Sequence, residues 1–283
     1  MPTFQEILSI NEQYAADNAK EPSAIKRLLM YHSHMEPHLF YTQLKERMNE
    51  DDYQAFLKDV DCYIKHHKPI QHLIGSEDFF GYTFKVNGDV LIPRFETEEL
   101  VAYVLDYMDA YFPHHETIHV LDVGTGSGCI GLTLAKENPR CQVTATDISG
   151  NALKVARENA QALGVQVRFL EGDLYQPIQG ERFDIIVSNP PYIPNTEEVL
   201  PVVRDHEPHV ALFGGVTGLE YYERLIGEAS QYLKPHAMMA FEHAFDKAKA
   251  LRKLIKKALP HQRVEQKKDM QHKDRMTFVF IES

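Results

Sequence analysis

The fold of this chain is decided by residues 121 to 128, which read Leu121-Asp122-Val123-Gly124-Thr125-Gly126-Ser127-Gly128. A short apolar run typical of a strand, 119–123, leads into the glycines, and a run with helical spacing, 129–136, follows them. Glycines at a strand-to-helix turn keep the turn tight and let the backbone approach a ligand. The stretch therefore predicts a ligand-binding loop in an α/β domain, although such a loop alone does not identify the ligand.

Strands and helices alternate beyond this loop. The sequence predicts a helix at 152–163 that ends at Gly164, and strands at 142–146, 165–170, 183–188, 238–242 and 277–281. A Lys-rich helix separates the last two strands. Such alternation predicts a parallel sheet with helices on both faces.

The first 75 residues predict a separate helical domain. Ser23 precedes a helical stripe of Ile25, Leu28 and Leu29, and a second stripe opens near Asp51. A domain of this kind either docks a partner or only supports the main domain, and the sequence leaves both roles open.

Residues 76–93 predict a β-hairpin that links the helical domain to an α/β domain at 94–283. Asn87-Gly88 lies between two β-rich runs, and this pair favours a hairpin turn because both central residues need positive φ. Pro93 ends the segment, and Thr97 opens the next helix.

The composition narrows the class of protein. The chain has 283 residues, of which 43% are hydrophobic and 25% charged, which is typical of a globular protein. Its formal net charge of -11 favours a protein or small-molecule substrate, because proteins that grip nucleic acid usually carry a basic face. No stretch approaches the roughly 18 apolar residues that span a bilayer. Residues 1–6 lack the basic start and apolar run of a secretory signal.

Cysteine and histidine usage favours a reducing, cytoplasmic location and no metal site. Cys62, Cys129 and Cys141 are odd in number and widely spaced, so they form neither a disulfide framework nor a zinc motif. The chain has 15 histidines, some in pairs such as His66-His67, but no converging cysteine or acidic partners accompany them. We interpret them as surface residues.

Acidic residues around the loop indicate which nucleotide it binds. Asp147 follows the loop by about 20 residues, at the end of the next predicted strand, where it can accept hydrogen bonds from ribose hydroxyls. No Lys-Ser/Thr follows the loop, and its glycine spacing differs from that of a dinucleotide site. Asp122 lies just before the loop, and acidic groups suit the amino group and positive sulfonium of S-adenosylmethionine. Asp173 either flanks the adenine or is a turn residue.

The turn after the strand 183–188 reads Ser188-Asn189-Pro190-Pro191-Tyr192. Ligands in such folds bind at the carboxyl ends of strands, so this turn points into the site. Each proline fixes its own φ and restrains the residue before it. The Asn189 side-chain oxygen and the Pro190 carbonyl are then two rigid acceptors for the hydrogens of an –NH2 group, and Tyr192 offers a flat face for a planar substrate.

An amide or exocyclic amino nitrogen is a poor nucleophile because its lone pair is delocalised. Accepting both N–H bonds moves electron density onto the nitrogen and aims its lone pair at a methyl donor. Positioning supplies roughly 7–11 kcal/mol of a barrier in favourable cases. The alternative interpretation, a purely structural proline turn, does not explain why the glycine loop, Asp147 and the sheet order accompany it.

These motifs together resemble one family, the HemK/PrmC glutamine N5-methyltransferases of peptide chain release factors. The Asn-Pro-Pro-Tyr turn itself is shared more widely, with enzymes that methylate planar –NH2 groups, DNA adenine included. The stretches that carry the closer resemblance are 71–75, 80–84, 91–98, 122–129, 147–149, 187–194 and 207–219. Three departures from the family pattern are Phe95 in place of a second proline, Lys234-Pro235-His236-Ala237 in place of Pro-Gly-Gly, and Glu242-His243-Ala244 in place of Glu-Ile-Gly.

The resemblance implies a Rossmann-like class I methyltransferase domain with a small N-terminal helical bundle and a β-hairpin linker. It implies that the substrate is the glutamine of the Gly-Gly-Gln motif of class 1 release factors, with no membrane and no stable nucleic-acid partner. The expected catalytic residues are Asn189, Pro190, Pro191 and Tyr192. The expected cofactor-binding residues are Asp122, Gly124, Thr125, Gly126, Ser127, Gly128, Asp147, Ile148, Asp173, Leu174 and Asn189.

Two rival hypotheses remain from the sequence. One is a nucleic-acid amino methyltransferase, acting on adenine N6 or guanine N2, which would call for a Lys- and Arg-rich recognition region. The first 70 residues are not markedly basic. The other is a non-catalytic scaffold, which the presence of both Asp147 and Asn189 disfavours.

Overall fold

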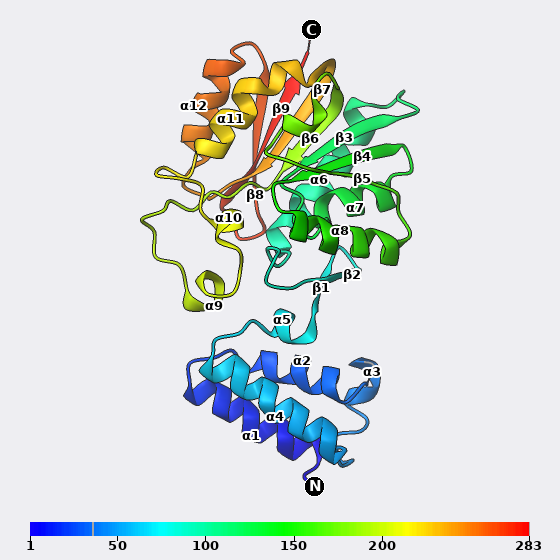
Figure 1. Ribbon diagram of the computed structural model, residues 1–283, viewed down its shortest axis with the longest axis vertical. Helices are drawn as coiled ribbons and strands as arrows, with labels where there is room; N and C mark the ends of the chain where they lie inside the picture. The colour runs from blue at the N-terminus through cyan, green and yellow to red at the C-terminus, as the bar shows by residue number, and fades with distance from the viewer. Residues whose placement is uncertain (36, 283) are drawn as a thin grey trace. The chain divides into compact units, whose positions relative to one another are not determined.

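The computed structural model describes residues 1–35 and 37–282 and divides into two compact units. One unit consists of Met1–Ser76 with Val199–His206, and the other of Glu77–Glu198 with Glu207–Ser283. Figure 1 shows their elements in chain order. Across the described residues no helix combines the length and apolar character needed to cross a bilayer.

The first unit is helical, as predicted. It contains α1 (Phe4–Asp17), α2 (Ser23–His32), α3 (Pro37–Phe40), α4 (Glu50–Lys65), α5 (Ile70–Ile74) and, from the later segment, α9 (Pro201–Arg204). Thr3 and Glu6 form a reciprocal capping box at the start of α1, and Asn49 caps α4 through the amide of Asp51. The faces that α1 to α5 bury form one core, which includes Ile7, Ile25, Leu28, Phe56 and Val60.

A β-hairpin is present at the predicted segment, but its turn is not the predicted one. Strands β1 (Ser76–Phe79) and β2 (Tyr82–Lys85) pair around Phe80-Gly81, which have φ of 54° and 78°. The assignment of the turn to Asn87-Gly88 was wrong, because the chain directly after that pair, up to the helix that begins at Phe95, forms no strand.

The chain after β2 docks on a helix instead of pairing with β2. The Lys85 amide donates to Asn159 Oδ1 at 2.7 Å, and Asn159 Nδ2 donates to the Lys85 carbonyl at 3.1 Å. Asn159 belongs to α8 (Gly150–Leu163). Asn87 then closes a local turn, in which its Oδ1 accepts from the Asp89 amide at 2.9 Å.

The second unit is built on a seven-stranded sheet of order β5-β4-β3-β6-β7-β9-β8. Strands β3 to β7 pair in parallel, and β9 runs antiparallel to both β7 and β8. The sheet confirms the predicted α/β architecture. Its strands are β3 (Ile118–Val123), β4 (Cys141–Asp147), β5 (Arg168–Glu171), β6 (Phe183–Ser188), β7 (Leu233–Glu242), β8 (Arg263–Lys268) and β9 (Asp274–Ile281).

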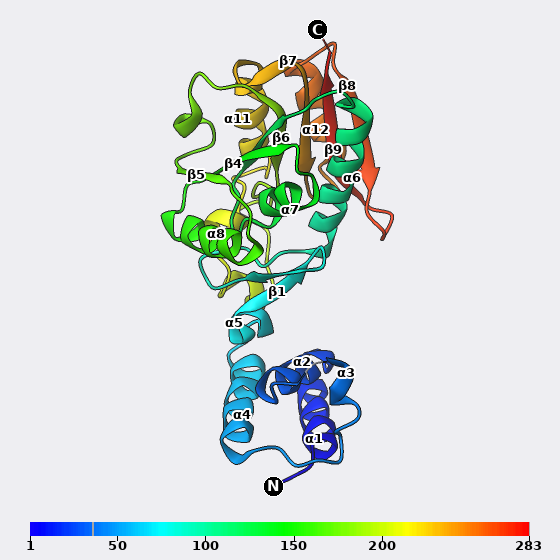
Figure 2. The same cartoon turned by 90° about the vertical axis from the view of Figure 1, so that its right-hand side faces the viewer.

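Helices cover both faces of this sheet, as Figure 1 and Figure 2 show. One face carries α6 (Phe95–Tyr111), α7 (Cys129–Glu137) and α8, and the other carries α11 (Glu220–Glu228) and α12 (Ala248–Ala258). Short elements complete the connections: η1 (Gln176–Ile178), α10 (His209–Leu212) and η2 (Ala229–Gln231).

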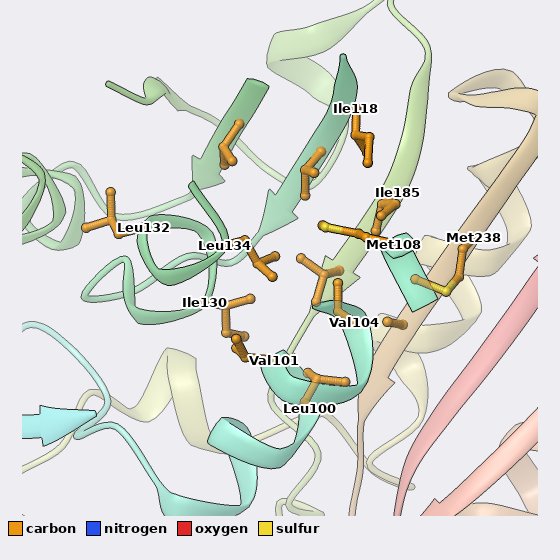
Figure 3. Close-up of a cluster of buried hydrophobic side chains, with 14 of the residues drawn as sticks. Leu100, Val101, Val104, Met108, Ile118, Ile130, Leu132, Leu134, Ile185 and Met238 are labelled. Carbon is orange, nitrogen blue, oxygen red and sulfur yellow. The ribbon is translucent and has the colours of Figure 1, made fainter. Parts of the chain in front are cut away.

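The packing of α6 on the sheet fixes the position of this helix relative to β6 and β7. Figure 3 shows Val104 and Met108 of α6 beside Ile185 of β6 and Met238 of β7. All four side chains are fully buried. Burial of a side chain of this size stabilises the fold by roughly 1.5–3 kcal/mol. The packing therefore fixes the second half of α6 against the middle of β6 and β7.

Candidate active site

A cavity opens at the carboxyl ends of the parallel strands β3, β4 and β6. Its walls come from the glycine loop, from the turns after β4 and β5, from the turn after β6, and from the segment that leads into α6. The space inside it, including the open solvent at its mouth, is about 1000 Å3. The predicted residues on its wall are Gly124, Thr125, Gly126, Ser127, Asp147, Ile148, Asp173, Leu174, Asn189, Pro190 and Pro191.

The glycine loop is held mainly by its own backbone. The amides of Gly124 and Thr125 both donate to the Thr146 carbonyl, at 2.8 and 3.0 Å. The Gly126 amide donates to Asp147 Oδ2 at 2.9 Å, and the Gly128 amide donates to the Thr125 carbonyl at 2.9 Å. These four amides therefore already have protein acceptors and are not arranged to hold a phosphate.

Gly128 lies behind the loop and does not line the cavity. It caps α7 with φ of 87°, and a Cβ there would lie 2.7 Å from Leu132 Cδ1 and 3.3 Å from Ala156 Cβ. The expectation that Gly128 contacts the cofactor is thus corrected: glycine is needed here for the backbone conformation and for close helix packing.

Asp122 also lies behind the loop, contrary to the expectation that it contacts the cofactor. Its fully buried carboxylate accepts from Thr125 Oγ1 at 2.6 Å and from the Gly131 amide at 3.0 Å. Burial raises its pKa to about 6, against the effect of these two donors. Its contribution is to fix Thr125 and the first turn of α7.

Asp147 lies at the end of β4 and faces the cavity, where it was predicted. Its two carboxylate oxygens accept from the amides of Gly126 and Ser149, at 2.9 and 2.8 Å. Burial raises the pKa of this carboxyl, and the backbone donors oppose that shift. A carboxylate offers about four acceptor positions, so Asp147 keeps capacity for two ligand hydroxyls. The neighbouring Ile148 side chain is 55% exposed at the cavity wall.

The turn after β5 contributes an apolar and an acidic side chain. Leu174 has φ of 49°, which is uncommon for a residue with a Cβ, and its nearly buried side chain lines the cavity. Asp173 also lines the cavity, and it forms an ion pair of 2.5 Å with Arg224.

The turn after β6 is clamped from behind by a glycine-rich segment. A Cβ at Gly214 would lie 2.3 Å from the Pro191 carbonyl oxygen, and one at Gly218 would lie 2.2 Å from that of Tyr192. Only glycine allows such close backbone contact. These two glycines were not predicted as site residues, although the stretch 207–219 contributed to the family resemblance.

Tyr192 is the one predicted catalytic residue that does not line the cavity. Its hydroxyl lies 3.5 Å from Glu242 Oε1, at the end of β7, and burial raises its pKa. The Tyr192 side chain is partly buried, and its hydroxyl has its hydrogen-bond partner away from the cavity wall. Tyr192 therefore lies outside the cavity lining, and its role as a stacking face stays a prediction.

A polar chain beneath Asn189 was not predicted. Asn189 Nδ2 donates to Thr97 Oγ1 at 3.3 Å, and Thr97 Oγ1 donates to Glu242 Oε2 at 2.6 Å. Thr97 is on the first turn of α6, and Glu242 is 1% exposed. Burial raises the pKa of Glu242 to about 7, while the Thr97 hydroxyl, Arg275 and the Asn189 amide lower it.

A buried carboxylate also holds the segment that leads into α6. Glu207 Oε1 pairs with Arg94 at 2.5 Å, and its Oε2 accepts from the Ile92 amide at 3.0 Å. Arg94 lines the cavity. No spacing pattern indicates this pair in the sequence, because 113 positions separate the two residues.

The three departures from the family pattern lie outside the cavity wall. Phe95 is 58% exposed at the first position of α6. His236 stacks on Tyr111 at 4.0 Å between ring centroids. His243 is buried, with Nε2 2.9 Å from Thr277 Oγ1, and burial lowers its pKa. The latter two side chains are accommodated by local packing.

Comparison with known proteins identifies the family. The methyltransferase small domain model matches residues 106–205. A release factor glutamine methyltransferase of Bacillus subtilis is 41% identical, with 99% of each chain covered, and one of Streptococcus pneumoniae is 41% identical with 85% of each covered. A methyltransferase structure from Pyrococcus furiosus has a TM-score of 0.52 at 18% identity, covers 83% of this chain and 100% of its own, and supports the fold alone.

These matches confirm the Rossmann-like class I methyltransferase fold and the resemblance carried by the glycine loop and the Asn-Pro-Pro-Tyr turn. The chain belongs to the release factor glutamine methyltransferase family.

Proposed function

We propose that this protein transfers a methyl group from S-adenosylmethionine to the side-chain amide nitrogen, N5, of the glutamine in the Gly-Gly-Gln motif of class 1 peptide chain release factors. Family membership supports the substrate. The observation that carries the chemistry is that Asn189 and Pro190 share one cavity with the glycine loop and Asp147. The activity belongs in the cytoplasm, where translation terminates.

The cavity fits a nucleoside cofactor that has no phosphate. The amides of Gly124, Thr125 and Gly126 are bonded within the protein, so the loop offers close backbone contact and no anion cradle. Asp147 would accept hydrogen bonds from the ribose hydroxyls. The apolar side chains of Ile148 and Leu174 would pack against the adenine. When bound, S-adenosylmethionine supplies an electrophilic methyl group on a positively charged sulfur.

Asn189 and Pro190 would prepare the glutamine amide. Asn189 Oδ1 and the Pro190 carbonyl each accept one amide hydrogen, and the prolines cannot compete as backbone donors. The two acceptors hold the amide plane and leave the nitrogen lone pair free on one side. No titrating base is needed before attack, because an N-alkylated amide cation is a strong acid and releases its proton to water.

The remaining parts of the chain have structural roles in this proposal. Residues 94–283 form the methyltransferase domain, 76–93 the linker, and 1–75 a helical domain available for docking the release factor. Asp122 and Gly128 hold the glycine loop, and Tyr192 packs toward Glu242.

A labelling experiment tests the proposal. The full chain is incubated with methyl-labelled S-adenosylmethionine in three separate reactions. One contains a class 1 release factor, one ribosomal RNA and one DNA. We expect label in the release factor alone. Label in nucleic acid, with none in the release factor, would instead support the amino methyltransferase alternative.

A further inference from the structure

We propose that Glu242 and Thr97 are positioning residues that set the direction in which the Asn189 amide faces. The inference rests on the proposed function, because it explains how Asn189 presents an oxygen to a substrate –NH2 group. Neither residue is required to touch the substrate. The argument depends on the direction of two hydrogen bonds that join three elements: the turn after β6, the start of α6 and the end of β7.

When Glu242 is ionised, at pH values above its pKa of about 7, the chain of hydrogen bonds has only one consistent direction. An ionised carboxylate accepts and cannot donate, so Glu242 Oε2 requires the Thr97 hydroxyl proton, across 2.6 Å. With its proton committed, the Thr97 oxygen can only accept from its other neighbour. That neighbour, 3.3 Å away, must then be the Asn189 –NH2 group. The Asn189 carbonyl oxygen is left for the cavity.

The reversed amide is disfavoured for two reasons. If Asn189 Oδ1 faced Thr97, two acceptors would meet unless the Thr97 proton left Glu242. The buried Glu242 would then lose its short donor, and an unsatisfied buried acceptor costs about 1–3 kcal/mol, more when it is charged. A reversed Asn189 would also present N–H groups to the substrate –NH2 group, so donor would face donor.

The surroundings of Glu242 make Thr97 its main donor. Glu242 is 1% exposed, and the Tyr192 hydroxyl is distant at 3.5 Å. The Tyr222 hydroxyl donates to the Glu242 backbone carbonyl and not to the carboxylate. Arg275 on β9 faces this carboxyl and lowers its pKa, but its guanidinium is paired with Asp269 at 3.2 Å. Glu96 on α6 repels it and raises its pKa.

Four variants test the inference. Thr97→Val keeps the side-chain shape and removes both hydrogen bonds, whereas Thr97→Ser keeps the hydroxyl. Glu242→Gln keeps the shape but can present either an oxygen or an –NH2 group to Thr97. The contact with Thr97 remains, but the direction of its hydrogen bonds is no longer imposed. The matched control is Thr133→Val, since Thr133 is also fully buried, lies on α7, and has an unpartnered hydroxyl away from the cavity.

The kinetic readouts are kcat, the KM for the release factor and the Kd for S-adenosylmethionine. We expect Thr97→Val to lower kcat by roughly 10- to 100-fold with little change in the cofactor Kd, because misplacing a positioning group acts on the reacting geometry. Thr97→Ser should recover most of the wild-type kcat, Glu242→Gln should fall between, and Thr133→Val should keep the wild-type value. Equal kcat losses in Thr97→Val and Thr133→Val, or in Thr97→Val and Thr97→Ser, would overturn the inference.

A second measurement is independent of turnover. In protein labelled with 15N-asparagine, the Asn189 side-chain –NH2 signal is identified by its loss in Asn189→Ala. We expect its two protons to exchange with water faster in Thr97→Val than in the wild type or in Thr97→Ser. Unchanged exchange would refute the hydrogen-bond chain. If the wild type labels no release factor, the proposed function fails, and this exchange measurement still decides the orientation of Asn189.

Discussion

The two walls of the cavity are built in different ways. The wall at residues 122–149 is formed by neighbouring backbone: Gly124, Thr125 and Gly126 bond to Thr146 and Asp147, about 21 residues away. The wall around Asn189 depends on side chains from distant parts of the chain, because Thr97 and Glu242 are 92 and 145 positions away from their partners. The first wall is suited to holding a cofactor, and the second to orienting a substrate amide. Substitutions in the two walls should therefore affect different constants.

The largest effect is expected from the substrate wall. Asn189→Ala removes one of the two acceptors for the amide hydrogens, so we expect kcat to fall by roughly 100-fold or more, as when one transition-state hydrogen bond is lost. The Kd for S-adenosylmethionine should remain measurable, although weaker if Asn189 also touches the cofactor. The measurement is single-turnover methylation together with calorimetric cofactor binding.

The control for this substitution is Asn195→Ala, which removes an exposed asparagine from the same connection. It should keep the wild-type kcat. An Asn189→Ala enzyme with near-normal turnover would contradict the role assigned to this wall.

The cofactor wall should respond in binding. Asp147→Ala removes an acceptor for ribose hydroxyls and the partner of two loop amides, so we expect the cofactor Kd to rise by roughly 10- to 100-fold, since hydrogen bonds to charged groups contribute about 1.5–3 kcal/mol each. At saturating cofactor, kcat should fall much less than in Asn189→Ala. Asp106→Ala, an exposed change on α6, serves as the control. If Asp147→Ala lowered kcat and left the Kd for S-adenosylmethionine unchanged, the division into a cofactor-binding wall and a substrate-orienting wall would be wrong.

The pH dependence of stability tests the burial of the substrate wall. The pKa of Glu242 is raised from its ordinary 4.5 to about 7, so the folded state keeps a proton that the unfolded state loses between these values. The resulting stability is full below pH about 4.5 and is lost as pH rises through about 7. His243, whose pKa is lowered, changes stability in the opposite direction over part of this range. The contribution of Glu242 to the pH dependence of stability is therefore taken as the difference between the wild type and a variant that lacks this carboxyl group.

Urea unfolding of the wild type and Glu242→Gln between pH 4.5 and 7.5 gives that difference. We expect the wild type to lose stability relative to Glu242→Gln as pH rises. A difference that is constant across the range would show that Glu242 titrates at its ordinary pKa, and that it is not buried as described.

The smallest effect is expected at the edge of the substrate wall. Phe95 occupies the first position of α6, where proline is favoured, and Arg94 before it is extended, as a residue before proline must be. Phe95→Pro should thus change the free energy of unfolding by no more than about 0.5 kcal/mol. Ala102→Pro, in the middle of the same helix, should cost about 3 kcal/mol or more. Similar losses in both variants would contradict the assigned start of α6.

The same contrast explains what could be predicted from the sequence. The glycine loop, Asp147 and the Asn-Pro-Pro-Tyr turn are short motifs next to predicted strands, and the parallel sheet brings their ends together. Asp122, Gly128 and Tyr192 were close in sequence to these motifs, but the side chains of Asp122 and Tyr192 face the supporting structure, and Gly128 serves the backbone turn and helix packing. A motif predicts the position of a residue along the backbone, whereas the direction of its side chain depends on the elements packed behind it.

The remaining differences have the same origin. Thr97 was expected only to open a helix and Glu242 only to end a strand, and no local pattern indicates that the two side chains meet. The hairpin turn was misplaced because Asn87-Gly88 has the preferred composition. The docking of Lys85 on Asn159, 74 positions away, instead determines where β2 ends.

The most direct test of the central claim is to locate the transferred methyl group. A class 1 release factor is treated with the full chain and S-adenosylmethionine, digested, and the peptide that contains Gly-Gly-Gln is sequenced by tandem mass spectrometry. We predict a single added methyl group on the glutamine side chain, absent when Asn189→Ala replaces the wild type. A methyl group on any other residue of that peptide would contradict the account. So would a peptide that stays unmodified after long incubation with excess S-adenosylmethionine.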